Sequence, residues 1–287
     1  MRSAYICFCL LVFVPLVSAS GTPEEFEPET NLTIMGSSFI INGQLTYPGP
    51  NLQAWGTLMN VRMVNSVFED RNPETCPKGF DPEANTSSFI ASMDQYRSKG
   101  ILAFTVNLQG GMPGYENALN SAFSPDGSLR PSYMDRVARV IEAADEKVMV
   151  IILGFFYQRQ DQVLEDAEAV KKAAANAASW LRDRGYTNVM VEISNEYRHP
   201  GFDHELLLSE EGQVELMRLV RSKAPSIPVS TSGMGNARFH PLLAEAADYI
   251  LLHGNTSDPE DYPERIKTVS VYGKPVIFNE DWCFSDD

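Results

Sequence analysis

The sequence contains few cysteines and lacks the short signatures of several common enzyme classes. Cysteine occurs four times in 287 residues. No strand-like run leads into GxGxxG or GxxxxGK[ST], which argues against a nucleotide-binding fold, and the GxSxG signature of serine hydrolases is also absent. The histidines are His199, His204, His240 and His253, and they form no His-X-His pair or carboxylate–histidine cluster at the spacing of a metal site. We therefore expect no metal centre.

Basic residues are scarce relative to acidic ones. Lys and Arg together number 23, against 38 Asp and Glu, which gives a formal net charge of −15. Because nucleic acids and anionic lipid surfaces repel so acidic a chain, we expect neither as a partner. The sequence carries no indication of oligomeric state.

Long apolar runs are absent except near the N-terminus. After Met1 and Arg2 the stretch AYICFCLLVFVPLVSA is short and ends in small residues, which is typical of a secretory signal peptide rather than of a membrane span. We expect residues 1–19 to be a signal peptide cut near Ala19, with an uncleaved anchor as the alternative. The mature protein is then secreted, and we expect its acidic, Pro-rich segment 20–35 to be disordered.

In a secreted protein, cysteines can form disulfides and Asn-X-Ser/Thr sequons can carry glycans. Cys7 and Cys9 lie in the expected signal peptide, so the mature chain keeps Cys76 and Cys283. In an oxidising compartment we expect these two to form a disulfide, the alternative being two unpaired thiols. Three Asn-X-Ser/Thr sequons are weak evidence for a glycoprotein. They begin at Asn31, Asn85 and Asn255.

Residues 36–287 show the pattern of one α/β domain. The segment SSFIINGQLTYPGPN predicts a hairpin with Asn42 and Gly43 at its turn. Apolar runs then alternate with helical patterns. Strands are expected at 56–68, 101–111, 147–157, 187–196, 227–233, 248–255 and 274–280. Helices are expected at about 86–99, 131–145, 161–185 (with Asp161 as N-cap), from Ser209 to before Pro225, 240–247 and 260–271.

This alternation predicts a parallel sheet with both faces buried, and its spacing fits a (β/α)8 TIM-barrel type of fold. An open doubly wound sheet is the alternative. Seven strands are found where a barrel needs eight. We expect either that the hairpin near 38–48 contributes to the barrel or that the barrel is incomplete after strand seven.

Two of these strands end in the same pair of residues. VEISNE ends in Asn195 and Glu196, and KPVIFNE ends in Asn279 and Glu280. Because catalytic residues of α/β barrels lie at the C-terminal ends of the strands, the two carboxylates are expected on one rim. Glycoside hydrolysis is commonly catalysed by a pair of carboxyl groups with separated pKa values. The alternative for each Glu is a solvent-facing rim residue or a salt bridge.

The strand ends VEISNE and PVIFNE resemble strands four and seven of clan A glycoside hydrolases, with the cellulase-like family 5 as the most similar group. The segment FIINGQ also resembles the one that precedes the first strand in that family. The resemblance implies that Glu196 is the general acid/base, Asn195 a ligand of the sugar 2-hydroxyl and Glu280 the nucleophile. It also implies retention of configuration. Because a two-carboxylate mechanism needs neither a metal nor an organic cofactor, we expect none.

The resemblance extends to His253, and three departures accompany it. His253 ends strand six, where the clan often has a His near the nucleophile, so we expect it to orient Glu280 or bind sugar; the alternative is a rim histidine without a role. Strand two lacks the family's Arg, for which Arg62 on strand one could substitute, although a buried structural Arg is equally compatible. Tyr197 replaces the usual Pro, and strand three ends in Phe-Tyr-Gln instead of His.

Other side chains near strand ends are candidates for sugar contacts. Asn107 and Gln109 could bind hydroxyls, with Gly110 and Gly111 allowing close backbone approach. Aromatic stacking on sugar faces is possible, with core packing as the alternative; the aromatic candidates are Tyr157, Tyr197 and Trp282. Glu192 shares the inward face of its strand with Glu196, and we expect it to be a buried, hydrogen-bonded support.

These observations predict a secreted, retaining O-glycosidase acting on an oligo- or polysaccharide. A carbohydrate-binding barrel without activity is the alternative. Substituting Glu280 by Gln separates the two, because an enzyme would lose turnover whereas a binding protein would lose little.

Overall fold

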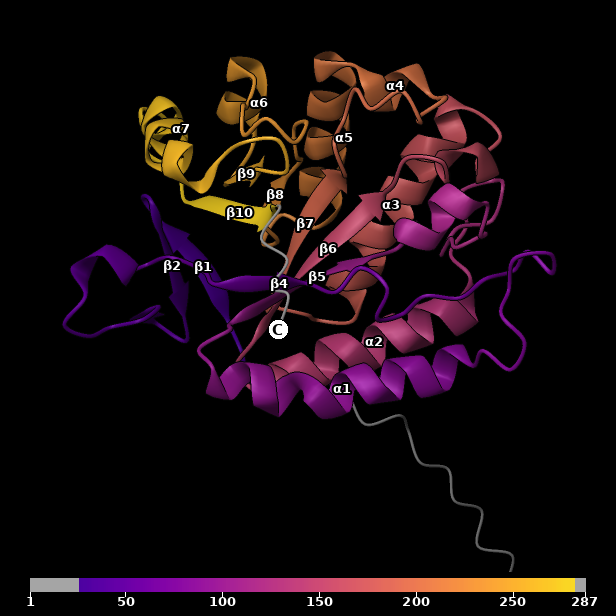
Figure 1. The fold of residues 1–287 in the computed structure, drawn as a ribbon, viewed down its shortest axis with the longest axis horizontal. Coiled ribbons are helices and arrows are strands. Elements are labelled where there is room, and N and C mark those ends of the chain that lie inside the picture. The colour runs from indigo at the N-terminus through magenta and orange to yellow at the C-terminus, as the bar shows by residue number, and fades with distance from the viewer. Residues whose placement is uncertain (1–25, 282–287) are drawn as a thin grey trace, which may run out of the picture.

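A computed structural model of the protein describes residues 26–281 (Figure 1). The expected signal peptide therefore lies outside the described residues, as do Trp282 and Cys283. Within residues 26–281 no helix is both long and apolar enough to cross a bilayer.

A small antiparallel sheet precedes the main sheet. Strands β1 (Leu32–Met35), β2 (Ser38–Ile41) and β3 (Gln44–Leu45) pair in that order. The β2–β3 turn contains Asn42 and Gly43, both with positive φ, as two-residue hairpin turns require, so the predicted hairpin is confirmed. The expected disorder over 20–35 is wrong for its last part, because β1 pairs with β2 along its whole length.

All seven strands predicted for the barrel are present, in two parallel sheets. Five strands pair in parallel in the order β4 (Asn60–Arg62), β5 (Ala103–Asn107), β6 (Val150–Phe156), β7 (Val189–Ser194) and β8 (Val229–Ser230). Strands β9 (Ile250–His253) and β10 (Val276–Glu280) form a second parallel pair. A parallel bridge between Ser232 and Leu251 joins β8 to β9, so the strands form one curved series.

Helices cover the outside of this series. They are α1 (Pro82–Ser98), α2 (Pro131–Asp145), α3 (Ala167–Asp183), α4 (Glu205–Leu208), α5 (Glu210–Lys223), α6 (Pro241–Ala246) and α7 (Tyr262–Ser270). Short 3-10 turns are η1 (Leu52–Ala54), η2 (Met112–Glu116), η3 (Asp161–Val163) and η4 (Pro259–Asp261). In Figure 1 the helices α1 to α3 flank the strands β4 to β7, and α5 to α7 follow around the sheet.

The start of α3 corrects a prediction. Asp166, whose side chain accepts the N–H of Ala169, caps this helix. Asp161, the expected cap, accepts the backbone N–H groups of Asp203 and His204 instead. Its carboxylate therefore fastens the loop after β7, an interaction between distant segments that local helix signals cannot show.

The hairpin fills the amino-terminal end of the barrel. Leu32, Phe39 and Ile41 form one buried cluster with residues near the start of the main strands, among them Ala103 and Val150. A larger apolar cluster lies between the strands and the helices. Because the hairpin covers the amino-terminal end of the barrel, a site accessible to a ligand is expected at the carboxyl ends of the strands.

The barrel is incomplete between β10 and β4, as expected for a series that ends after strand seven. Within residues 26–281 no strand pairing joins these two strands. The side chain of Asn60 on β4 reaches across and donates a 2.9 Å hydrogen bond to the carbonyl of Phe278 on β10. The two edges of the series are thus tied by a side chain.

Candidate active site

The backbone directs both strand-end glutamates toward one place. Glu196 follows β7 with a left-handed φ of 51°, and its N–H donates to Oγ of Ser232 at 2.9 Å. Strand β10 has an irregularity at its end, where Phe278 pairs with Leu252 but Glu280 pairs with His253. Such a bulge re-aims side chains. It places Glu280 beside His253.

The two carboxylates meet around His253. One carboxylate oxygen of Glu196, one of Glu280 and a ring nitrogen of His253 all lie within 4.8 Å of one another. Nδ1 of His253 is 3.4 Å from Oε1 of Glu196 and 3.5 Å from Oε2 of Glu280. The side chains of Glu196 and Glu280 are 12% and 19% exposed, whereas His253 is fully buried. The carboxylates can therefore reach a ligand, and His253 acts from behind them.

Arg62 completes the cluster from the opposite edge of the sheet. Its Nη2 lies 2.9 Å from Oε2 of Glu280 and also donates to Oδ1 of Asn195. The Asn195 Nδ2 atom donates to Oε1 of Gln158 at 3.1 Å. The guanidinium of Arg62 on β4 thus contacts Glu280 directly.

These contacts favour the ionised form of Glu280. Burial raises the pKa of its carboxyl, but Arg62, His253 and the amide of Asn255 outweigh burial and lower that pKa below its usual range. Glu280 is accordingly an anion at neutral pH. An ionised carboxylate held among cationic groups is suited to act as a nucleophile.

His253 carries a proton at neutral pH. Complete burial lowers its pKa, but the neighbouring carboxylates of Glu192, Glu196 and Glu280 raise the pKa to about 9. Nε2 of His253 lies 3.7 Å from Oε1 of Glu192, and Oε2 of Glu192 accepts from Nδ2 of Asn279 at 3.2 Å. Glu192 is fully buried, so its predicted support role is confirmed.

Glu196, His253 and Glu280 are also close enough to hold a metal ion. The raised pKa of His253 argues for another use. A doubly protonated imidazole has no lone pair to donate to a metal. The Arg62 guanidinium already provides a positive charge beside Glu280. The donor set therefore suits chemistry by two carboxylates better than metal binding.

Three of the side chains expected to contact a sugar are buried. Asn195 has its amide engaged by Arg62 and Gln158. Asn107 is buried at the end of β5, with its Oδ1 packed so close to Gly154 that a Cβ there would lie 2.3 Å away. Tyr157 is buried under Gly110, and burial raises its pKa while the Arg62 charge lowers it. Asn195 and Tyr157 thus lie beside Arg62, whereas Asn107 lies against Gly154 of the neighbouring strand.

Two further candidates have structural contacts. Gln109 is fully buried, and its Nε2 donates to Oγ of Ser121 and to the carbonyl of Gln160. Its amide therefore braces a loop. The hydroxyl of Tyr197 donates to Glu210 at 3.1 Å, so the packing alternative holds for this aromatic.

Sequence reasoning missed some of the polar groups around the carboxylates. Asn255, two residues after His253, donates from Nδ2 to Oε1 of Glu280. Tyr115 receives a 2.7 Å hydrogen bond from Gln158 and lies 3.4 Å from Nε2 of His199. Asn255 lies at the end of the predicted sixth strand, which is a usable signal, whereas Tyr115 belongs to the 3-10 turn η2 in the loop after β5, where the sequence carries no such signal.

Cys76 is a partly buried free cysteine within the described residues. Its expected partner, Cys283, lies outside them. The disulfide between the two therefore stays a prediction.

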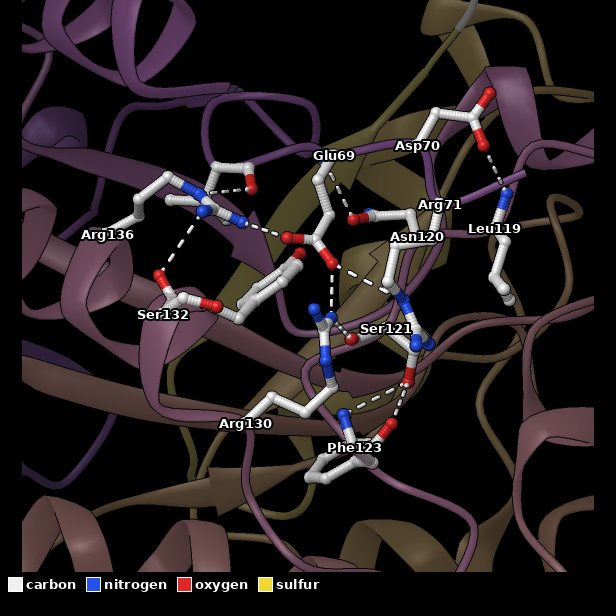
Figure 2. Close-up of polar contacts among 12 residues, drawn as sticks. Glu69, Asp70, Arg71, Leu119, Asn120, Ser121, Phe123, Arg130, Ser132 and Arg136 are labelled. Atoms are coloured by element: carbon white, nitrogen blue, oxygen red, sulfur yellow. Dashed lines mark hydrogen bonds and ion pairs between the residues drawn. The ribbon is translucent and has the colours of Figure 1, made fainter. Parts of the chain in front are cut away.

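A second cluster of charges, on the loop after β4, is structural. Figure 2 shows the buried carboxylate of Glu69 between Arg130 and Arg136, with Arg71 beside it. Its backbone N–H donates to Oδ1 of Asn120 at 3.1 Å. Both carboxylate oxygens are paired, and the cluster ties the loop to α2.

Several solved structures have a fold similar to that of this chain. A β-mannanase from the blue mussel Mytilus edulis aligns with a TM-score of 0.56 at 10% identity, covering 90% of this chain and 93% of the mannanase. A family 5 mannosidase from Rhizomucor miehei aligns with a TM-score of 0.55 at 14% identity, covering 88% of this chain and 72% of that one.

A family 5 enzyme from Prevotella bryantii also aligns, with a TM-score of 0.55 at 14% identity over 78% of this chain and 75% of the enzyme. No family model and no curated protein matches the sequence. The structural similarities show that this chain has the barrel fold of family 5 glycoside hydrolases, which confirms the predicted fold class.

Proposed function

We propose that this protein hydrolyses O-glycosidic bonds of an oligo- or polysaccharide with retention of configuration. The supporting observation is that carboxylate oxygens of Glu196 and Glu280 lie within 4.8 Å of each other. Retaining glycosidases hold their two carboxyl groups about 5–5.5 Å apart, whereas inverting enzymes need about 6.5–9.5 Å to admit a water molecule.

In the proposed reaction Glu280 attacks the anomeric carbon while Glu196 protonates the departing glycosidic oxygen. The resulting glycosyl ester on Glu280 is then hydrolysed by water, which Glu196 deprotonates. Arg62 and protonated His253 keep Glu280 ionised before the attack. Since His253 contacts both carboxylates, it also fixes their separation.

The proposed substrate is a β-linked mannose or glucose polymer. Solved structures of the same fold are named as a mannosidase and a β-mannanase. We further propose that the protein is secreted after cleavage near Ala19, which would place it with such a polymer outside the cell. No metal and no organic cofactor takes part in this reaction.

The test is to express residues 20–287 and assay mannan, glucomannan, carboxymethylcellulose and aryl β-glycosides. E280Q should abolish turnover. E196Q should lower it by about 10²–10⁴-fold on substrates whose leaving group needs a proton. E215Q is the control, because Glu215 lies half-exposed on α5 and pairs with Lys171. Hydrolysis that survives E280Q would contradict the proposal.

The unpaired edges of β4 and β10 favour a second candidate, a carbohydrate-binding protein without turnover. Within residues 26–281, strands β4 and β10 lack a strand between them. In that case wild type and E280Q would both bind mannan or cellulose oligosaccharides in calorimetry, and neither would release sugar.

A further inference from the structure

Asn255 lies beside Glu280, in the segment that follows β9. It follows β9, whose last residue, His253, pairs with Glu280. The N–H of Gly254 donates to the Glu280 carbonyl at 2.8 Å, and the Nδ2 of Asn255 donates to Oε1 of the same residue. The segment after β9 therefore holds Glu280 by both its backbone and its side chain.

Gly254 makes this approach possible. A Cβ at position 254 would lie 2.3 Å from the hydroxyl oxygen of Tyr262, the first residue of α7. The absence of a side chain lets the backbone pass beneath Tyr262 and brings Asn255 against the carboxylate. Thr256 fixes the far side, since its N–H and its hydroxyl both bond to the carbonyl of Gly235.

The two oxygens of Glu280 are held differently. Oε2 is shielded from solvent and lies against Arg62 and His253. The exposed part of the carboxylate is therefore on the side of Oε1, which Asn255 contacts. An amide donor there fixes the rotation of the carboxylate and leaves the other lone pair of Oε1 available for attack.

We propose that Asn255 is the positioning residue of the nucleophile, and that its place in an Asn-X-Ser/Thr sequon makes glycosylation there incompatible with an active site. This inference rests on the proposed function of Glu280. The sequon is Asn255-Thr256-Ser257. A glycan is attached to Nδ2, the atom that bonds Glu280, so the sugar would be built against the carboxylate.

Several other groups influence the same carboxylate and must be kept unchanged in a test. Arg62 and His253 favour its ionised form. Glu196 lies across the site, and Tyr157 lies close enough for its hydroxyl to sense the charge of Glu280. Asp281 is the next residue in the chain. Substitutions at position 255 leave all five in place.

The test measures the titration of Glu280 directly. Protein with ¹³C-carboxyl glutamate is followed by NMR over pH, and the resonance of Glu280 is assigned by its loss in E280Q. N255A removes the donor, and N255D keeps the shape while adding a negative charge. Both should raise the pKa of Glu280, N255D more than N255A. S257A abolishes the sequon but retains the amide, so its titration should match wild type.

Activity on aryl β-glycosides gives a second measurement. N255A should lower kcat/KM about tenfold, the effect of losing one hydrogen bond to a charged group, while S257A should not change it. An unchanged Glu280 titration in folded N255A and N255D overturns the inference, whatever the activity. A shifted titration in a protein that hydrolyses nothing supports the positioning role and contradicts the proposed function.

Glycan mapping tests the second half of the inference. The chain secreted from a glycosylating host is separated into active and inactive fractions, and peptides containing position 255 are examined by mass spectrometry. The inference predicts that active protein carries an unmodified Asn255. A glycan on Asn255 in the active fraction would overturn it.

Discussion

Nη2 of Arg62 lies 2.9 Å from Oε2 of Glu280, although the two residues belong to the first and last strands of the series. The same strands are tied by the hydrogen bond from Asn60 to the Phe278 carbonyl. One arginine thus spans the incomplete part of the barrel and stabilises the charge of the proposed nucleophile.

Replacing Arg62 should therefore affect activity and its pH dependence together. R62M should lower kcat/KM by about 10²–10³-fold, the cost of removing a preorganised charged donor. R62K should recover part of this loss, because an ammonium retains the charge but cannot contact Asn195 and Glu280 with the same fork. Since Arg62 lowers the pKa of Glu280, the acid limb of kcat/KM should move to higher pH in R62M.

The control for this series is R182M, because Arg182 is half-exposed and pairs with its neighbour Asp183 at the end of α3. It should leave the pH profile unchanged. An R62M enzyme with reduced activity but an unshifted acid limb would show that Arg62 only packs.

His253 should make the stability of the protein depend on alkaline pH. Its pKa rises from 6.5 in the unfolded chain to about 9 in the fold. The stabilisation is therefore complete below about pH 6.5 and is lost as pH rises through about 9. The full change corresponds to about 3 kcal/mol, at about 1.4 kcal/mol per pKa unit.

Urea unfolding at pH 6.5 and pH 9.5 checks this prediction. Wild type should lose stability between the two, and H253N should lose much less. H240N serves as the control, since His240 is a surface residue at the start of α6. A wild-type stability that stays constant over this range would argue against a buried, protonated His253.

Glu69 should be important for stability but not for chemistry. Its carboxylate neutralises Arg130 and Arg136, and the Arg136 side chain is only 3% exposed. E69A leaves Arg130 without its ionic partner and removes the shorter of the two ion pairs of Arg136, so it should lower the free energy of unfolding by about 3–5 kcal/mol. E83Q removes a half-exposed partner of the same Arg136, and its cost should stay below about 1 kcal/mol. Equal costs for both would contradict the structural role of Glu69.

The other two sequons should differ in occupancy. Nδ2 of Asn85 donates to the carbonyls of Asn65 and Ser66, which leaves no room for a glycan without breaking this contact. Asn31 is exposed just before β1. Peptide mapping of protein secreted from a glycosylating host should find a glycan on Asn31 and none on Asn85. A glycan on Asn85 would mean that modification precedes folding of the loop after β4.

Much of the fold could be predicted from the sequence because its apolar strands alternate regularly with helices. The strand 150–156 is buried along its whole length, and such runs are recognisable without tertiary information. The start of α3 was misplaced because Asp161 bonds to a loop more than forty residues away. Strand β1 was missed because its partner, β2, supplies the pairing that its own composition does not suggest.

The site was predictable where it depends on strand ends. Glu196 and Glu280 were found because each ends a strand after an Asn, and the rim of a barrel brings strand ends together. The contact between Arg62 and Glu280 depends on how the first and last strands approach each other, which no local pattern encodes. The sequence shows Asn255 only as part of a sequon, because the bulge that turns Glu280 toward it is a feature of the pairing between β9 and β10.

The stereochemistry of the first released product tests the central claim most directly. Hydrolysis of a 2,4-dinitrophenyl β-glycoside that the protein accepts is followed by ¹H NMR from the first turnovers, before the anomers equilibrate. With Glu196 and Glu280 oxygens within 4.8 Å, the β-anomer should appear first. Initial release of the α-anomer would show inversion and would contradict the assignment of Glu280 as nucleophile.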